Sequence, residues 1–201
     1  MELTVKVGLA ALRVIVGALF FGHGMQKLTG WFGGGGLEAT GDAFESMGLR
    51  PGRTHAAAAG AGEAVGGALL AKGLFTPLGA SLISGTMITA IRKVHGDKGP
   101  WLSKGGYEYN LVLLAIVFAV TDVGPGAWSL DERLGIRRSG LGWALAQLGA
   151  GLIGSTVAIE LGSRVPAQPP VFDAGPSANG AGEHQGDEVG DGAAAQAAAE
   201  E

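Results

Sequence analysis

One stretch near the start of the chain, Val7–Met25, reads VGLAALRVIVGALFFGHGM and decides the class of fold. It is apolar apart from Arg13 and His23. At about 1.5 Å per residue, a helix of this length crosses most of a hydrocarbon core about 30 Å thick. A signal peptide is the competing interpretation, but the apolar run is too long and no small-x-small cleavage site follows it. We therefore predict a first transmembrane helix.

Later segments of the chain show a similar apolar character and end at charged or turn-forming residues. The sequence predicts an all-α membrane protein, with a four-helix transmembrane bundle and a fifth, C-terminal transmembrane helix. A short amphipathic helix over Leu37–Met47 is expected on the membrane surface. After Val7–Met25, the predicted spans are His55–Lys72, Phe75–Ile91, Glu108–Val120 and Leu141–Leu161.

Charge divides the chain into unequal parts. Charged residues make up 16% of the whole, below the roughly 25% of an ordinary soluble domain. Residues 165–201 contain seven acidic residues and no Lys or Arg, so a total of −4 leaves the first 164 residues at +3. A mildly basic body suits contact with anionic lipid headgroups, and nothing in the sequence predicts nucleic-acid binding.

The absence of cysteine excludes thiolate zinc sites and cysteine-ligated iron–sulfur clusters.

These features predict three regions and a location. Residues 1–131 form the four-helix core, 132–164 a polar connector with the fifth membrane helix, and 165–201 a disordered acidic tail rich in Ala, Gly and Pro. We expect a multi-pass protein of the cell membrane, which in a bacterium is the inner membrane. The positive-inside rule gives five basic residues on one side and eight on the other, which favours cytoplasmic first and third loops.

Ionisable side chains inside the predicted spans are the most informative ones, because a charge at mid-depth costs roughly 2.5–3.5 kcal/mol. Arg13 lies ten residues before His23, and Glu63 lies eight residues after His55. These spacings place both charges about 12–15 Å below the same surface. We predict a buried Arg13–Glu63 ion pair, for which a purely structural role is an equally good interpretation. Both helix faces carry small residues that allow close packing: Gly17 and Gly24 beside Arg13, and Ala59, Gly66 and Gly67 beside Glu63.

Further polar residues are predicted to gather at the same end of the bundle, above an apolar interior. Such a pocket suits a quinone headgroup or a small anion. A haem would need two histidines that face each other within the membrane, whereas the histidines here lie near loop ends. We expect no metal site and no covalent cofactor, and the catalytic residues, if any, are not identified. The candidate ligand-binding residues are Arg13, His23, Lys27, Glu63, His95 and Glu108.

Several spaced motifs resemble those of the DoxX family of small bacterial membrane proteins. They are Arg13 followed by GALFFGHG (residues 17–24) and Lys27-Leu28, then EAVGGALL (63–70), GLFT (73–76), GPG (124–126) and WSLD (128–131). The resemblance implies a four-helix membrane core. The family is named from a subunit of a thiosulfate:quinone oxidoreductase, and some members are linked to oxidative-stress complexes or quinone detoxification. By position, its characteristic polar residues would be Arg13, His23, Lys27 and Glu63.

Three functions follow as hypotheses, and the sequence does not decide whether the chain is an enzyme. The first is a redox-associated membrane subunit that holds a quinone near Arg13, His23, Lys27 and Glu63, with the cations stabilising anionic oxygen and Glu63 or His23 transferring protons. The second is a non-enzymatic anchor or assembly partner for soluble redox proteins or a larger membrane complex. The third, transport of a small solute, is disfavoured because the sequence shows no inverted repeat.

Overall fold

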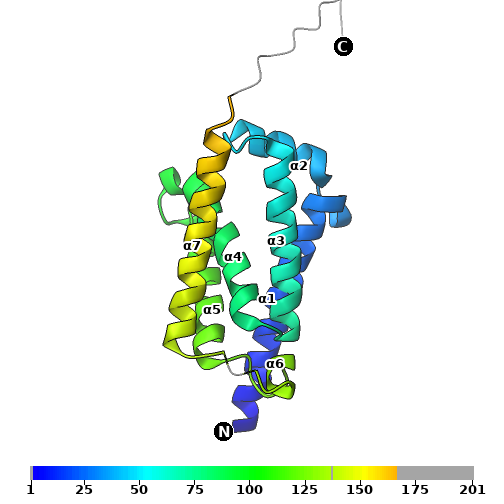
Figure 1. The fold of residues 1–201 in the computed structure, drawn as a ribbon, viewed down its shortest axis with the longest axis vertical. Helices are drawn as coiled ribbons and strands as arrows, with labels where there is room; N and C mark the ends of the chain where they lie inside the picture. Colours follow the sequence, from blue (N-terminus) through cyan, green and yellow to red (C-terminus); the bar gives the residue numbers. More distant parts are fainter. Residues whose placement is uncertain (1, 137, 167–201) are drawn as a thin grey trace, which may run out of the picture. The chain divides into compact units, whose positions relative to one another are not determined.

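The structure, a computed structural model, describes residues 2–136 and 138–166, and these residues form helices and connections without any strand. Within these ranges five long helices run alternately up and down the bundle (Figure 1). They are α1 (Glu2–Thr29), α3 (Gly52–Lys72), α4 (Thr76–Ala90), α5 (Glu108–Val123) and α7 (Leu141–Ser163). The all-helical fold is therefore confirmed. The predicted acidic tail lies outside the described residues, apart from Val165 and Pro166.

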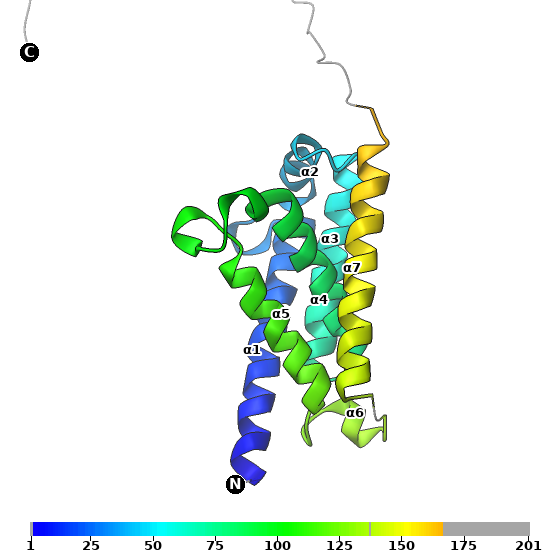
Figure 2. The ribbon, with the colours of Figure 1, turned by 90° about the vertical axis from the view of Figure 1, so that its left-hand side faces the viewer.

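The shorter elements lie at the two ends of the bundle. One end, called here the α2 end, holds η1 (Trp31–Gly33), α2 (Gly36–Ser46) and the connection 91–107, which contains η2 (Ile91–His95), η3 (Gly96–Lys98) and η4 (Leu102–Lys104). The other, the α6 end, holds the turn 73–75 and α6 (Leu130–Arg133) (Figures 1 and 2). The first and third loops therefore share one end, as the alternating direction of the helices requires.

The helices agree with the predicted segments, but α1 and α3 are longer than predicted. α1 continues past Met25 to Thr29, and α3 begins at Gly52 rather than at His55. A short helix is present where Leu37–Met47 was predicted, as α2, and the fifth apolar segment forms the helix α7. Of the helices in the described part of the chain, two are long and apolar enough to cross a membrane, Val7–Thr29 and Leu141–Ser163.

Glycine sets the close approach of α1 and α3. A Cβ atom at Gly17 would collide with the backbone of α3 at Gly67 and Ala71. One at Gly24 would collide with the backbone at Gly60 and Ala64. The backbones can pack this closely only because these positions lack a side chain. The small residues predicted to share a helix face with Arg13 thus form the contact with α3, as expected.

The interior of the bundle is partly polar, and its outer surface is largely apolar. Between α4 and α7, Ser84 Oγ donates a hydrogen bond to Gln147 Oε1 at 2.9 Å, and the hydroxyl groups of Thr89 and Ser155 lie 3.0 Å apart. An apolar cluster from α1, α3, α4 and α5 fills the centre. Large aliphatic side chains lie exposed on the outer helix faces, among them Ile15, Val112 and Ile153. This is the reverse of the pattern in a water-soluble bundle.

Candidate functional site

The central feature of the site is an ion pair between α1 and α3. Lys27 Nζ lies 2.6 Å from Glu63 Oε2. The Glu63 side chain is 6% exposed and that of Lys27 is 26% exposed. A carboxylate this deeply buried is costly unless a cation or hydrogen-bond donors compensate it, and Lys27 supplies that compensation.

The prediction that Glu63 pairs with Arg13 is wrong. The depths of the two residues below the surface were estimated from the ends of the predicted segments, and the helices extend beyond those ends. Arg13 lies sixteen residues before the end of α1 (29 − 13), whereas Glu63 lies eleven residues after the start of α3 (63 − 52). The glycine contacts fix the register of this antiparallel pair and place Glu63 opposite His23. The Cα–Cβ bonds of a helix tilt toward its N-terminus. Lys27 lies one turn beyond His23 along α1, so its side chain leans back toward Glu63, and that of Glu63 leans toward Lys27.

Arg13 instead binds backbone carbonyls at the α6 end. Its Nη1 atom donates to Ala71 O at 2.8 Å and its Nη2 atom to Trp128 O at 2.9 Å. A longer bond from Nη1 reaches Leu70 O at 3.4 Å. Ala71 and Leu70 lie in the last turn of α3, where carbonyls lack helical partners and the helix dipole favours a cation. Arg13 is 2% exposed, so it acts as a buried cap for α3.

The start of α4 is capped in the complementary way by Asp131. Its carboxylate accepts hydrogen bonds from Phe75 N at 2.8 Å, Thr76 N at 2.9 Å and Thr76 Oγ1 at 2.8 Å. An anion is stabilised at the N-terminus of a helix by the free amides and by the dipole. Arg13 and Asp131 thus hold the turn between α3 and α4 from both sides, which gives Arg13 a structural role away from the Lys27–Glu63 pair.

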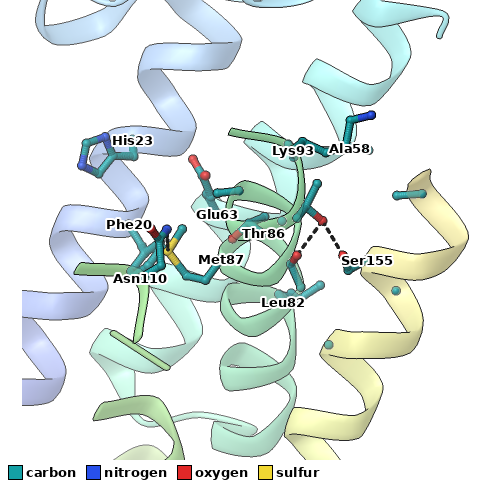
Figure 3. A pocket seen from close by; sticks show the side chains of 18 of the residues that line it. Phe20, His23, Ala58, Glu63, Leu82, Thr86, Met87, Lys93, Asn110 and Ser155 are labelled. Atoms are coloured by element: carbon teal, nitrogen blue, oxygen red, sulfur yellow. Dashed lines mark hydrogen bonds between the residues drawn. The ribbon is translucent and has the colours of Figure 1, made fainter. Parts of the chain in front are cut away.

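A cavity of about 580 Å³ lies next to the Lys27–Glu63 pair. All five long helices contribute to its wall, which is mainly apolar. This volume falls within the roughly 300–1,000 Å³ typical of small-molecule sites. Figure 3 shows the carboxylate of Glu63 among the side chains that line it.

Four of the predicted site residues line this cavity: His23, Lys27, Glu63 and His95. His23 is exposed, and its Nδ1 atom lies 3.0 Å from Gln26 Oε1. His95 Nδ1 lies 2.7 Å from Gly105 O. Arg13 and Glu108 do not line the cavity. Glu108 is exposed and accepts a hydrogen bond from Leu102 N at 2.9 Å, which shapes the connection before α5.

The sequence analysis missed Asn110, which lies in the first turn of α5. Asn110 is 6% exposed, lines the cavity and donates from Nδ2 to Met87 Sδ at 3.4 Å. A thioether is a weak acceptor, so this contact leaves most of the hydrogen-bonding capacity of the amide unused. In the sequence, Asn110 could have been recognised as a lone amide close to the start of a strongly apolar segment. Lys93, two residues after the end of the predicted span Phe75–Ile91, also lines the cavity.

Fold and site together define an all-helical protein with long apolar helices, a polar interior and an ion pair beside an apolar cavity. The DoxX family matches residues 8–96, from α1 to just after η2. A Bacillus subtilis (strain 168) protein named "Putative oxidoreductase CatD" is 35% identical over 121 residues, which are 60% of this chain and 84% of the relative. The chain belongs to the DoxX family, as its motifs indicate.

A second relative supports a membrane location. The "Uncharacterized membrane protein Rv3486" of Mycobacterium tuberculosis (strain ATCC 25618 / H37Rv) is 30% identical over 144 residues, which are 65% of this chain and 83% of the relative. No solved structure matches this chain significantly. The family match ends before α5 and α7, so two of the helices that line the cavity lie outside the matched residues.

Proposed function

We propose that this chain is a multi-pass protein of the cell membrane in which α1, α3, α4 and α5 form the four-helix core and α7 is a fifth span. The tryptophans support this arrangement, because Trp residues concentrate at the two membrane–water interfaces. Trp31 and Trp101 lie exposed at the α2 end, and Trp128 and Trp143 lie exposed at the α6 end. The largely apolar surface between these two levels suits contact with lipid chains.

The lengths of the helices fit this proposal. α1, α3 and α7 have 28, 21 and 23 residues. α4 has only 15, but it continues directly into the five residues of η2, which gives the about 20 residues that a span needs. α5 has 16 residues and is entered through Tyr107 and the connection before it. α3 is rich in Ala and Gly and α4 is short, so neither helix stands out by apolar length alone.

Within this bundle, the proposed function is to hold a quinone in the cavity beside the Lys27–Glu63 pair, as part of a redox process. The observation that carries this proposal is a largely buried ion pair bordering a mainly apolar cavity. A quinone is a flat apolar ring with oxygen atoms at its edge, and it fits such a wall. The ammonium group of Lys27 would stabilise an anionic oxygen, and Glu63 would exchange protons with it, assisted by His23. The electrons would come from a partner redox protein or complex.

Asn110 supplies a second polar contact for the same ligand. Its amide is buried, and among residues 2–136 and 138–166 its hydrogen bond is the weak contact with Met87. An apolar pocket with a few precisely placed polar groups is the usual design of a small-molecule site, in which those groups set the orientation of the ligand. Asn110 would donate to one quinone oxygen while Lys27 faces another.

The experiment is to measure the quinone that co-purifies with the detergent-solubilised protein. Glu63→Gln removes the carboxylate at the cavity, and Glu132→Gln, an exposed position on α6, is the matched control. We expect near-stoichiometric quinone in the wild type and in Glu132→Gln, and a severalfold loss in Glu63→Gln. Background quinone in a folded wild-type protein would remove the support for this function and would favour the hypothesis of a membrane anchor for redox proteins.

A further inference from the structure

The cavity is larger than the ring of a quinone requires. A cavity of about 150 Å³ holds a benzene molecule. A single ring would therefore fill about a quarter of the 580 Å³ beside the Lys27–Glu63 pair. Empty apolar space of the remaining size is unfavourable unless a ligand or lipid chain occupies it, because the lining atoms lose their packing contacts.

The wall of the cavity differs between its two sides. The side toward α1 and α5 carries Lys27, Glu63 and Asn110, whereas the opposite side is built mainly from small residues of α3 and α7. In Figure 3 Glu63 and Asn110 lie toward α1, and Ser155 lies on α7 across the cavity. The small residues recur at helical spacing and so share one face of each helix. They are Ala58, Ala59 and Gly62 on α3, and Ala150, Gly151, Gly154 and Ala158 on α7.

The cavity reaches the surface of the bundle between α3 and α7. Ala58 and Gly154 line the cavity and are also exposed. α7 packs mainly against α4, less against α5 and only slightly against α3. Toward the α2 end the gap is closed, since Arg50 N donates to Gly162 O at 3.3 Å and Gly162 packs against Leu49. The opening therefore lies on the side of the bundle, at a level that faces lipid chains in the proposed membrane arrangement.

A second opening lies between α1 and α5, where Leu19, His23 and Tyr109 line the cavity and are exposed. This opening carries an imidazole and a phenol, which suit an exchange of protons or water near the interface. The opening between α3 and α7 is bordered mainly by small side chains, which leave room for a hydrocarbon chain, and Lys93 lies near its Ala58 edge (Figure 3). The two openings therefore differ in the kind of group that each would pass.

We infer that the ligand is a quinone with a long isoprenoid tail and that this tail leaves the cavity between α3 and α7 into the lipid. The inference rests on the proposed function and narrows its substrate class. The ring occupies the part of the cavity next to Lys27, Glu63 and Asn110. The tail lies along the small residues of α3 and α7, and α7 serves as one wall of its path.

Binding of a short-tailed and a long-tailed ubiquinone to the full chain in nanodiscs tests this inference. Gly154→Leu adds a side chain at the opening, where a Cβ atom meets nothing within 4 Å. Gly149→Leu is the matched control on the same helix, since a Cβ atom there also meets nothing within 4 Å and Gly149 does not line the cavity. We expect Gly154→Leu to weaken binding of the long-tailed ubiquinone about tenfold, the equivalent of roughly two buried methylene groups. Binding of the short-tailed one should be unchanged.

The outcomes separate this inference from the proposed function. Unchanged long-tailed binding in Gly154→Leu overturns the path between α3 and α7 and leaves the quinone site intact. No binding of either ubiquinone to the wild type overturns the proposed function itself. An equal loss of both ubiquinones shows that the substitution blocks the ring, which also contradicts the inference.

Labelling of single cysteines gives a second measurement that does not depend on a bulky substitution. The chain has no cysteine, so Gly154→Cys and Leu19→Cys each introduce one thiol, at the two openings. A lipid-soluble maleimide should react with both. The long-tailed ubiquinone should slow labelling of Gly154→Cys severalfold, and the short-tailed one should not. Protection of Leu19→Cys instead would place the tail between α1 and α5 and overturn the inference.

Discussion

Removing Lys27 should destabilise the protein through Glu63. In Lys27→Met the Glu63 carboxylate, 6% exposed, loses its counter-ion without gaining water. Breaking a buried pair from one side typically costs about 3–5 kcal/mol, because it leaves a buried charge without compensation. The partial exposure of Lys27 and the cavity beside the pair reduce this cost, so we expect about 3 kcal/mol.

The double variant should recover much of this loss. Lys27→Met with Glu63→Gln removes both charges, and replacing a whole buried pair is often close to neutral. We therefore expect a coupling free energy of about 2 kcal/mol between the two positions, within the range found for contacting residues. Arg13 lies fourteen residues from Lys27 along α1, which corresponds to about 21 Å. The losses in the free energy of unfolding caused by Arg13→Met and by Glu63→Gln should therefore add to within about 0.5 kcal/mol.

The assay is reversible unfolding in mixed micelles by titration with a denaturing detergent, followed by circular dichroism. The free energy of unfolding of the wild type, the three single variants and the two double variants gives both coupling energies. A strong coupling of Arg13 to Glu63 with none between Lys27 and Glu63 would refute the register of α1 against α3. No coupling in either pair would refute the argument that Glu63 is desolvated.

Three further predictions use other parts of the fold. Asp131→Ala removes the cap of α4 and should lower the free energy of unfolding by about 2 kcal/mol, more than Asp131→Asn, which keeps one acceptor; equal effects would contradict the capping role. Gly67→Leu forces a side chain into the backbone of α1 and should cost at least about 3 kcal/mol, whereas Gly149→Leu should be tolerated in the same unfolding assay. Finally, most basic residues lie at the α2 end, which predicts that this end is cytoplasmic and that the α6 end faces outward. An impermeant maleimide applied to intact cells should therefore label Glu132→Cys at the α6 end and not Lys104→Cys at the α2 end. The reverse labelling pattern would show the opposite orientation.

The local features of this protein could be predicted from its sequence because each depends on a short stretch of chain. Apolar runs interrupted by charged or turn-forming residues located the helices, and helical spacing placed Gly17 and Gly24 on the face that meets α3. Charge within or next to an apolar span selected Glu63 and Lys27 as candidate site residues. Several motifs indicated DoxX membership, which is confirmed by the family match over residues 8–96 and by the relatives.

The partners of these side chains were decided only by the tertiary structure. Apolar segments do not mark the true ends of a helix, so the extension of α1 to Thr29 and of α3 back to Gly52 moved Arg13 and Glu63 to different levels. Their register depends on the points of closest approach between two helices, which are contacts between residues far apart in sequence. The cavity follows from the same cause: Asn110 and Gly154 lie on helices outside the matched residues 8–96, and only the packing of α5 and α7 against α4 brings them to the wall that Lys27 and Glu63 share.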